Sequence, residues 1–579
     1  MSEKVCNRVV KIGEIMLLKA TIFFTLSFNA FADYTPLEAD WSSNAHINPG
    51  ENRANIYNLD PVKLEEMKTA GYIHAMKYPV NVTGLLIPYQ PLLNFVNADP
   101  SDPLKKLIFQ LEKNISGLTS EKALYEWLGL NKINPDSATG IYKMPLPNGK
   151  RDQFYAGAGL VKTASGDGLT FSCFTCHSAN LFGTTVMGLT NKRVRANKFF
   201  HMARNIVPYM PNALFKLQTK ASDQDVLQFE RTKKNLLSVA AVVPQVMGLD
   251  TSLPQVALSL ARREDDEFAT KNRHFEKYPR YNELEKFVAD SKPLPWWNLK
   301  YKTRWLADGS IIEGNPIFTN ILWNELGRGA DLVELKQWMS ENRKTIDELT
   351  VAAFATEAPR WTDFFPVSSI KIEKAKKGEI VFKNSCQKCH GEYQKAWSEP
   401  NADAFSDLDK LATIKVIYSD QTKVKDVGTD PQRYEGIKFF ADALNRLDIS
   451  QWMKTYVEPQ KGYVPPPLVG VWARYPYLHN NAIPNLCALL TRPELRPKWF
   501  IQGPANNRDT DYDQTCVGYP VGNKIPREWL KDKEATYIAN QKGKGMSNLG
   551  HSKAIVGENG EDLLTPEQKM DLIEFLKTL

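Results

Sequence analysis

The chain has no basic block, no low-complexity tract and no tandem repeat, and only seven of its 579 residues are cysteine. Its net charge of +7 falls to +5 when the four basic and two acidic residues among the first 32 are set aside. This mild excess over a long chain gives no indication of nucleic-acid binding. Beyond residue 32, no apolar run approaches the length of a transmembrane helix, so we expect no membrane span there.

The first 32 residues have the organisation of a secretory signal peptide. Basic residues precede the apolar run ATIFFTLSFNAFA, which ends in the small-x-small site Ala30-Phe31-Ala32. The run is too short to span a membrane comfortably and is followed by this cleavage site. We therefore expect residues 1–32 to be removed and the mature protein to be periplasmic or secreted, with six cysteines left.

Four of those six cysteines stand in one pattern that occurs twice. Residues 172–177 read SCFTCH and residues 385–390 read SCQKCH. A C-x-x-C pair serves in a redox disulfide, in half of a zinc site or in covalent haem attachment, and a histidine directly after it favours haem. The thiols bond the haem vinyl groups and the histidine binds the iron. The sequence thus predicts two covalent haem c groups, on Cys173, Cys176 and His177 and on Cys386, Cys389 and His390.

The remaining pair, Cys487 and Cys516, lies near the C-terminus. In an oxidising compartment a disulfide between them is the default expectation. Two free buried thiols are the alternative.

Helical patterns surround the second motif. A ragged helical period runs into it through Ile372, Ala375, Glu379 and either Phe382 or Ile380. At the far end of the chain, Thr565, Pro566 and Gln568 form a helix start with a capping box. The apolar face of that last helix is Leu572, Ile573, Leu576 and Leu579. A helix leading into the motif and a closing helix predict one class I-like cytochrome c domain over residues 361–579.

The first motif lies in a different setting. It follows a glycine-rich loop or short-strand region, with helix candidates at residues 99–118 and 119–130 upstream and a charged, helix-like stretch at 220–290 downstream. We predict a mainly α fold with two c-type haem domains and long loops. Residues 33–360 form the first domain, which carries a large N-terminal elaboration.

The chain resembles the bacterial di-haem cytochrome c peroxidase and MauG superfamily, and within it the long branch of RoxA-type rubber oxygenases. The resemblance rests on PPPLVGVWARYPYLHNNAIPNL (465–486), on PLPWWNLKYKTRW (293–305) and on KGMSNLGHSKAI in the last third. The chain departs from the peroxidases at Arg474, where they have threonine, and at Asn480-Asn481, where they have a glycine turn. It also departs at Pro493, where they have a methionine ligand.

The resemblance implies roles for individual residues. His551 becomes the expected distal ligand of the second haem, with Met546 as its competitor, and His479 supports that haem without binding iron. Trp297 is preferred over Trp296 as an indole between or beside the haems; the alternative is that both are core aromatics. For the first haem, His201 is the nearest candidate ligand. No motif surrounds His46, His74 or His274.

Three functions remain open at this point. In the first, the N-terminal haem activates dioxygen or peroxide while the C-terminal haem handles electrons. The resemblance then implies either an apolar substrate such as polyisoprene or a small redox donor or acceptor. In the second, the protein is a non-catalytic periplasmic di-haem electron carrier. The third is a MauG-like oxidase of a partner protein. The resemblance also allows a calcium ion between the haems, which the residues neither require nor exclude.

Overall fold

The computed structural model describes residues 34–579 except 100, 104, 107–118, 147–154, 243–244, 263–288 and 540–544. The expected signal peptide, His274 and most of the helix candidate at 99–118 lie outside the described residues.

The α-helices are α2 (Pro61–Lys77), α3 (Tyr89–Val96), α5 (Glu121–Trp127), α6 (Phe174–His177), α7 (Ala196–Ile206), α8 (Asn212–Thr219), α9 (Asp223–Leu237), α10 (Ser252–Arg262), α11 (Pro316–Arg328), α12 (Leu332–Glu341), α13 (Arg343–Phe354), α14 (Ile372–Ser385), α15 (Gln387–His390), α16 (Asp407–Lys410), α17 (Gln432–Gly436), α18 (Ala441–Arg446), α19 (Asp448–Trp452), α20 (Leu486–Leu489) and α21 (Pro566–Leu576). The strands are β1 (Ile87–Pro88), β2 (Asn131–Lys132), β3 (Tyr155–Ala156), β4 (Ala158–Thr163), β5 (Gly166–Phe171), β6 (Ser178–Leu181), β7 (Thr184–Met187), β8 (Ile311–Glu313), β9 (Glu392–Lys395), β10 (Thr413–Ile417), β11 (Tyr456–Val457), β12 (Trp499–Ile501) and β13 (Thr536–Ile538). The fold is mainly α, with short antiparallel strand pairs.

An antiparallel sheet in the order β1-β5-β4 leads into the first motif. The β4–β5 hairpin pairs Ala158 with Phe171, and the chain then turns directly into α6. The Gly157 carbonyl accepts hydrogen bonds from the Ser172 amide at 2.9 Å and from the Thr175 hydroxyl at 2.7 Å. These bonds fix α6 to the start of β4. The short-strand expectation is confirmed, and this setting differs from the leading helix of a class I cytochrome.

The second motif does have the class I arrangement. Helix α14 crosses α21, and a Cβ atom built on Gly378 would lie 1.9 Å from the Asp571 carbonyl oxygen, so only glycine permits this approach. The rings of Phe382 and Phe575 lie 5.2 Å apart at the crossing. Phe382 is buried while Ile380 is 63% exposed, so Phe382 is the member of the predicted pair that faces the core.

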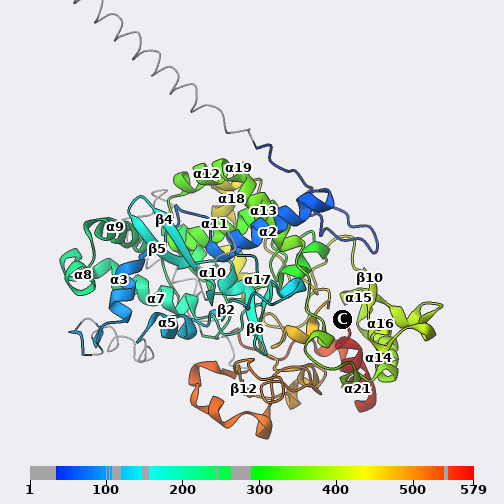
Figure 1. Cartoon of the computed structure of the whole chain (residues 1–579). Helices are drawn as coiled ribbons and strands as arrows, with labels where there is room; N and C mark the ends of the chain where they lie inside the picture. The colour runs from blue at the N-terminus through cyan, green and yellow to red at the C-terminus, as the bar shows by residue number, and fades with distance from the viewer. Residues whose placement is uncertain are drawn as a thin grey trace, which may run out of the picture.

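The closing helix α21 forms as the sequence predicts. Thr565 caps it, Pro566 opens its first turn, and Thr565 and Gln568 form the capping box. All four residues of its predicted apolar face are buried. Figure 1 shows α14, α15 and α21 gathered together, away from β4 and β5.

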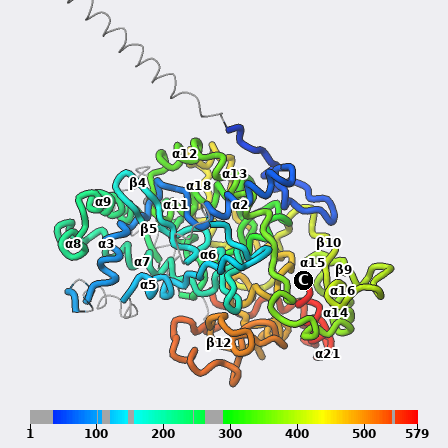
Figure 2. The backbone as a smooth tube through the Cα atoms, viewed as in Figure 1, coloured from blue at the N-terminus to red at the C-terminus, as the bar shows by residue number. Residues whose placement is uncertain are grey.

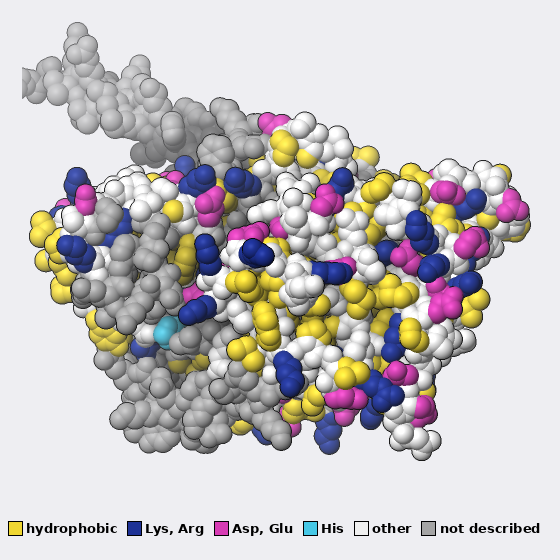
Figure 3. All heavy atoms as spheres, turned by 90° about the horizontal axis from the view of Figure 1, so that it is seen from below, with side chains coloured by type: hydrophobic (Ala, Val, Ile, Leu, Met, Phe, Trp, Pro, Cys, Tyr) yellow, Lys and Arg dark blue, Asp and Glu magenta, His cyan; other side chains and the backbone are white. Residues whose placement is uncertain are grey.

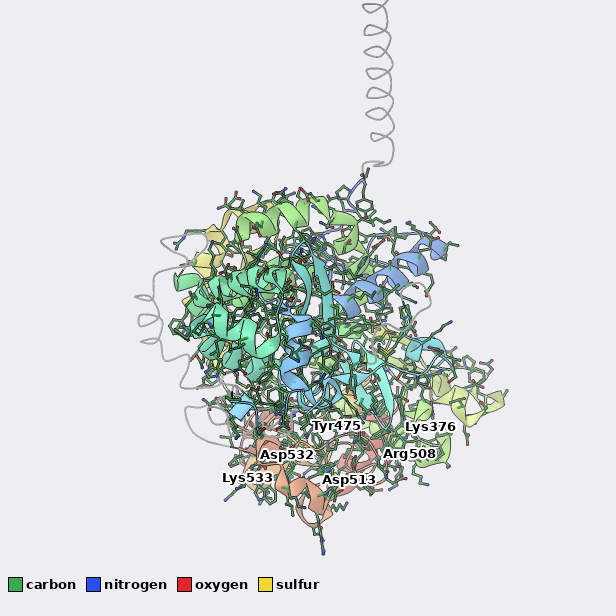
Figure 4. The ribbon with its side chains drawn as sticks, turned by 60° about the vertical axis from the view of Figure 1, so that its left-hand side comes forward. Lys376, Tyr475, Arg508, Asp513, Asp532 and Lys533 are labelled. Carbon is green, nitrogen blue, oxygen red and sulfur yellow. A yellow bond between two sulfur atoms is a disulfide. The ribbon has the colours of Figure 1, made fainter. Side chains whose placement is uncertain are left out.

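The two parts of the chain on either side of residue 360 are packed into each other. Residues of α18, α19 and β11 belong to the hydrophobic core around α11 and α13, and β11 pairs with β8. Arg193 binds Asp532 at 2.7 Å and Arg195 binds Glu534 at 3.1 Å. Figure 2 shows the β12 segment below the N-terminal part, and Figure 4 shows Asp532 and Tyr475 in the same region.

Candidate haem centres

The first motif forms one helical turn whose reactive side chains face a cavity. Within this turn the His177 amide donates to the Cys173 carbonyl at 3.0 Å. The Asn191 amide binds the Cys176 carbonyl at 2.9 Å, which secures the turn from the far side. Both cysteines are free thiols, and burial raises the pKa of Cys173 to about 11. Cys173, Cys176 and His177 all line the cavity.

This cavity has about 1850 Å³ of empty space, counted out to its mouth. Its walls come from α7, α10, α11 and the segment that ends in Trp296. Among the described residues that line it, His177 is the only histidine and there is no methionine. Its polar lining includes Asp250 and Lys292 as well as Asn320, Asn324 and Arg328. The described lining therefore provides one imidazole ligand, His177, and no thioether ligand.

Trp296 and Trp297 have separate positions. The Trp296 ring lies 5.4 Å from the His177 ring and stacks in parallel with Tyr72. Trp297 is fully buried, and its indole Nε1 donates to the Val469 carbonyl at 2.9 Å. The family resemblance favoured Trp297 as the indole beside the haems, yet Trp296 is the indole beside His177. The tryptophan doublet was the available signal, but it could not distinguish the two.

The second motif places His390 against a proline-rich loop. The Nδ1 atom of His390 lies 2.8 Å from the Pro466 carbonyl, which leaves Nε2 free to bind metal. Tyr393 donates to the His390 carbonyl at 3.0 Å and accepts from the Leu468 amide. Burial lowers the pKa of His390, which favours the neutral imidazole that a metal requires.

His551 faces His390. Their ring centroids lie 6.2 Å apart. Two imidazoles on opposite sides of one iron, each with a metal–nitrogen bond of about 2.0 Å, have centroids roughly 6 Å apart. His551 adopts a left-handed backbone with φ 67°, and its amide donates to the Val427 carbonyl at 2.8 Å. Burial lowers the pKa of His551 to about 4, so this imidazole is neutral as well. Met546 is buried in the core.

Two buried cations near the second motif also fit a haem. The Lys302 Nζ and Arg474 Nε atoms are buried and have no hydrogen-bond partner among the described residues. Arg474 is a charged neighbour of both Lys302 and His390, and its Nη1 donates to the Pro467 carbonyl at 2.8 Å. Buried cations need an anionic partner, and a haem carries two propionate carboxylates. Arg474 was visible in the sequence as a departure from the peroxidases, whereas Lys302 gave no signal.

His479 packs against Tyr463. Its ring stacks on Tyr463 with centroids 4.1 Å apart, and its Nε2 lies 3.1 Å from the Tyr463 hydroxyl. The His479 carbonyl accepts from the Lys292 amide at 2.8 Å. Burial, with Arg433 and Lys292 nearby, lowers its pKa to about 3. Asn481 has φ 58°, the left-handed turn that asparagine tolerates. Sequence reasoning missed Tyr463.

The three other histidines that the structure describes, His201, His74 and His46, have local partners. His201 lies on α7, 3.2 Å from the Asn205 side-chain amide, and is absent from the cavity lining. His74 binds Glu348 at 2.9 Å, and His46 is exposed beside Asp420. Cys487 and Cys516 form a disulfide.

In the described ranges, no group of three or more His, Cys, Asp or Glu side chains is placed to hold a metal ion. No helix of that same part of the chain is both long and apolar enough to cross a membrane.

Residues 462–501 match the sequence model of a family described as RoxA-like, cytochrome c-like. This range contains Pro466 and His479. The chain is 27% identical over 364 residues to the uncharacterized protein y4iJ of Sinorhizobium fredii, which is 51% of this chain and 56% of that protein. It is 34% identical over 124 residues to the uncharacterized protein y4iM of the same organism, 20% of this chain and 27% of that protein. The chain thus spans about half of the first relative and about a quarter of the second. The family match supports a RoxA-type cytochrome relationship and indicates a haem c oxidoreductase.

Proposed function

We propose that this chain is an exported di-haem c-type oxidoreductase. Its first haem binds and activates dioxygen or peroxide, and its second haem transfers electrons. The observation that carries the proposal is the asymmetry of the two sites. His177 faces a cavity whose described lining has no second histidine or methionine, whereas His390 faces His551.

At the first site, Cys173 and Cys176 would hold the haem covalently and His177 would bind its iron. A haem with one protein ligand supplies an open iron position for dioxygen or peroxide. Trp296 fixes one side of His177 by ring contact. Lining residues Asn320, Asn324 and Arg328 supply hydrogen-bond donors within the same cavity.

At the second site, Cys386 and Cys389 would hold the haem, and both His390 and His551 would bind its iron. Two strong ligands leave no place for a substrate, so this site is suited to electron transfer. Histidine in place of methionine lowers the reduction potential. Arg474 and Lys302 would pair with the propionates, and these positive charges would raise the potential again.

Trp297 supports a connection between the two sites. It directly follows Trp296, whose ring lies 5.4 Å from the His177 ring. Its indole donates to Val469, which lies three residues after Pro466, the partner of His390. Trp297 thus lies between a residue that contacts His177 and the loop that binds His390, a position suited to an electron relay.

Three alternatives for the reaction are separated by assay. The purified protein is supplied with polyisoprene and dioxygen, with hydrogen peroxide and a reduced small cytochrome, or with the donor alone. The first two proposals expect turnover that disappears in the Cys173→Ala/Cys176→Ala variant, which keeps one haem per chain. Oxidation of the donor without consumption of either oxidant would overturn the enzyme proposal and favour an electron carrier.

A further inference from the structure

A second cavity lies on the other side of α7 and contains no part of either haem motif. Its volume is about 140 Å³, comparable to an apolar protein cavity of roughly 150 Å³ that binds benzene. Its walls come from α3, α7, α8 and α9, which lie near one another in Figure 1. We propose that this cavity binds a hydrocarbon chain, and that it holds part of an apolar substrate close to the first haem cavity.

The chemistry of the wall selects the ligand. Except for two threonines, every described residue that lines the cavity is apolar. The Thr219 hydroxyl donates to the Phe215 carbonyl at 2.7 Å, and the Thr232 hydroxyl donates to the Leu86 carbonyl at 2.6 Å. Both hydroxyl protons are therefore already used within the protein. A polar group buried here would lose its bonds to water and find no replacement, so the ligand chain must be hydrocarbon.

Exposed apolar side chains lie next to lining residues along the chain. Tyr209, Leu214 and Leu217 are 50%, 36% and 75% exposed, and they lie beside the lining residues Met210 and Phe215. Figure 3 shows hydrophobic side chains at the left edge of the molecule, the side on which Figure 1 places α3 and α8. Such a patch gives a poorly soluble ligand a surface on which to bind before it enters.

Helix α7 forms a common wall between this cavity and the first haem cavity. Phe199, Met202, Ala203 and Ile206 line the apolar side, and Ala196, Asn197 and Phe200 line the haem side. Within each set, residues lie one, three or four positions apart. Each set therefore occupies one face of the helix, and the two faces differ. Phe199 on the apolar side lies 5.6 Å, ring to ring, from Phe171 on the haem side. One layer of side chains thus separates the two cavities.

Binding of the hydrocarbon needs only the apolar wall, whereas the role in holding substrate rests on the proposed function. The test measures binding alone, by equilibrium dialysis of radiolabelled farnesene, a short isoprenoid hydrocarbon. The haem-loaded protein is kept without oxygen so that no turnover occurs. A protein that binds farnesene but lacks activity would overturn the proposed function and leave this inference standing.

Two lining variants and one control locate the site. Ile206→Asn places an amide in the wall, and Ala203→Leu reduces the volume without adding polarity. Ile380→Asn makes the same change as the first on the exposed face of α14. We expect the Kd for farnesene to rise at least about tenfold with each lining variant and to stay unchanged in the control.

Either of two results would overturn the inference. One is the absence of saturable binding by the unaltered protein, which would mean that the cavity is filled by another occupant. The other is an unchanged Kd in both lining variants. Haem absorbance and circular dichroism identify a variant that fails to fold, and the remaining lining variant then decides.

Discussion

The imidazole rings of His390 and His551 lie 6.2 Å apart, although 161 residues of sequence separate them. The first follows a CxxC pair on α15, and the second lies in a C-terminal loop in a left-handed conformation. The spacing matches two ligands of one iron. This pair distinguishes the second site from the first, where His177 is the only histidine among the described residues of the cavity lining.

Replacing His551 with methionine tests this pair. The thioether is a weaker donor to ferric iron, so the reduction potential of the second haem should rise by on the order of 100 mV. A potentiometric titration followed by haem absorbance measures the change. His201→Met is the matched control, because His201 does not line the first cavity, and it should leave both potentials unchanged. Unchanged potentials in the His551 variant would remove His551 from the proposed ligand set.

The crossing of α14 and α21 depends on Gly378. Gly378→Ala would place a methyl group 1.9 Å from the Asp571 carbonyl oxygen, so the helices must separate. We expect a loss of about 3 kcal/mol in the free energy of unfolding, measured by urea denaturation. Lys377→Ala, at an exposed neighbouring position, should leave stability within about 0.5 kcal/mol of the unaltered protein. Equal stabilities would mean that the crossing is not tight.

Stability should fall as the pH is lowered from about 6.5 towards 3. The pKa of His479 is about 3 in the folded protein and 6.5 in its ordinary state, so the unfolded chain binds one more proton in this window. Protonation therefore favours the unfolded chain. Urea midpoints measured across this range should vary less steeply in His479→Gln than in the unaltered protein. Parallel pH profiles would contradict the buried neutral state of His479.

Trp297→Phe removes the hydrogen bond to the Val469 carbonyl. A buried carbonyl then loses its donor, which should cost about 1–3 kcal/mol of stability. Electron transfer between the haems, measured after flash reduction, should also slow. Trp361→Phe removes a similar bond, from a buried indole to Ser369, and should lower stability without slowing electron transfer. Equal rates in both variants would exclude the relay role of Trp297.

The sequence could predict those features that depend on neighbouring residues. The capping box of α21 and the helix that leads into Cys386 require only local spacing, and both are present. The choice between Phe382 and Ile380 required knowledge of where α21 lies. So did the positions of Trp296 and Trp297, because adjacent residues of a tight turn point in different directions.

Features assembled from distant segments gave no local signal. The packing of α18 and β11 into the core around α11 follows from tertiary contacts alone. The apolar cavity behind α7 likewise combines four helices, each of which has an ordinary amphipathic pattern. Arg474 could be recognised as unusual, but its neighbour Lys302 comes from a segment far away in the sequence.

The most direct test of the account is a low-temperature electron paramagnetic resonance spectrum of the purified, fully ferric protein. The account predicts one high-spin signal from the haem at His177 and one low-spin signal from the haem between His390 and His551. In the His551→Ala variant, the low-spin signal should be lost while the original high-spin signal stays. Two low-spin signals in the unaltered protein would contradict the account, because the first iron would then have a strong second ligand and no open position.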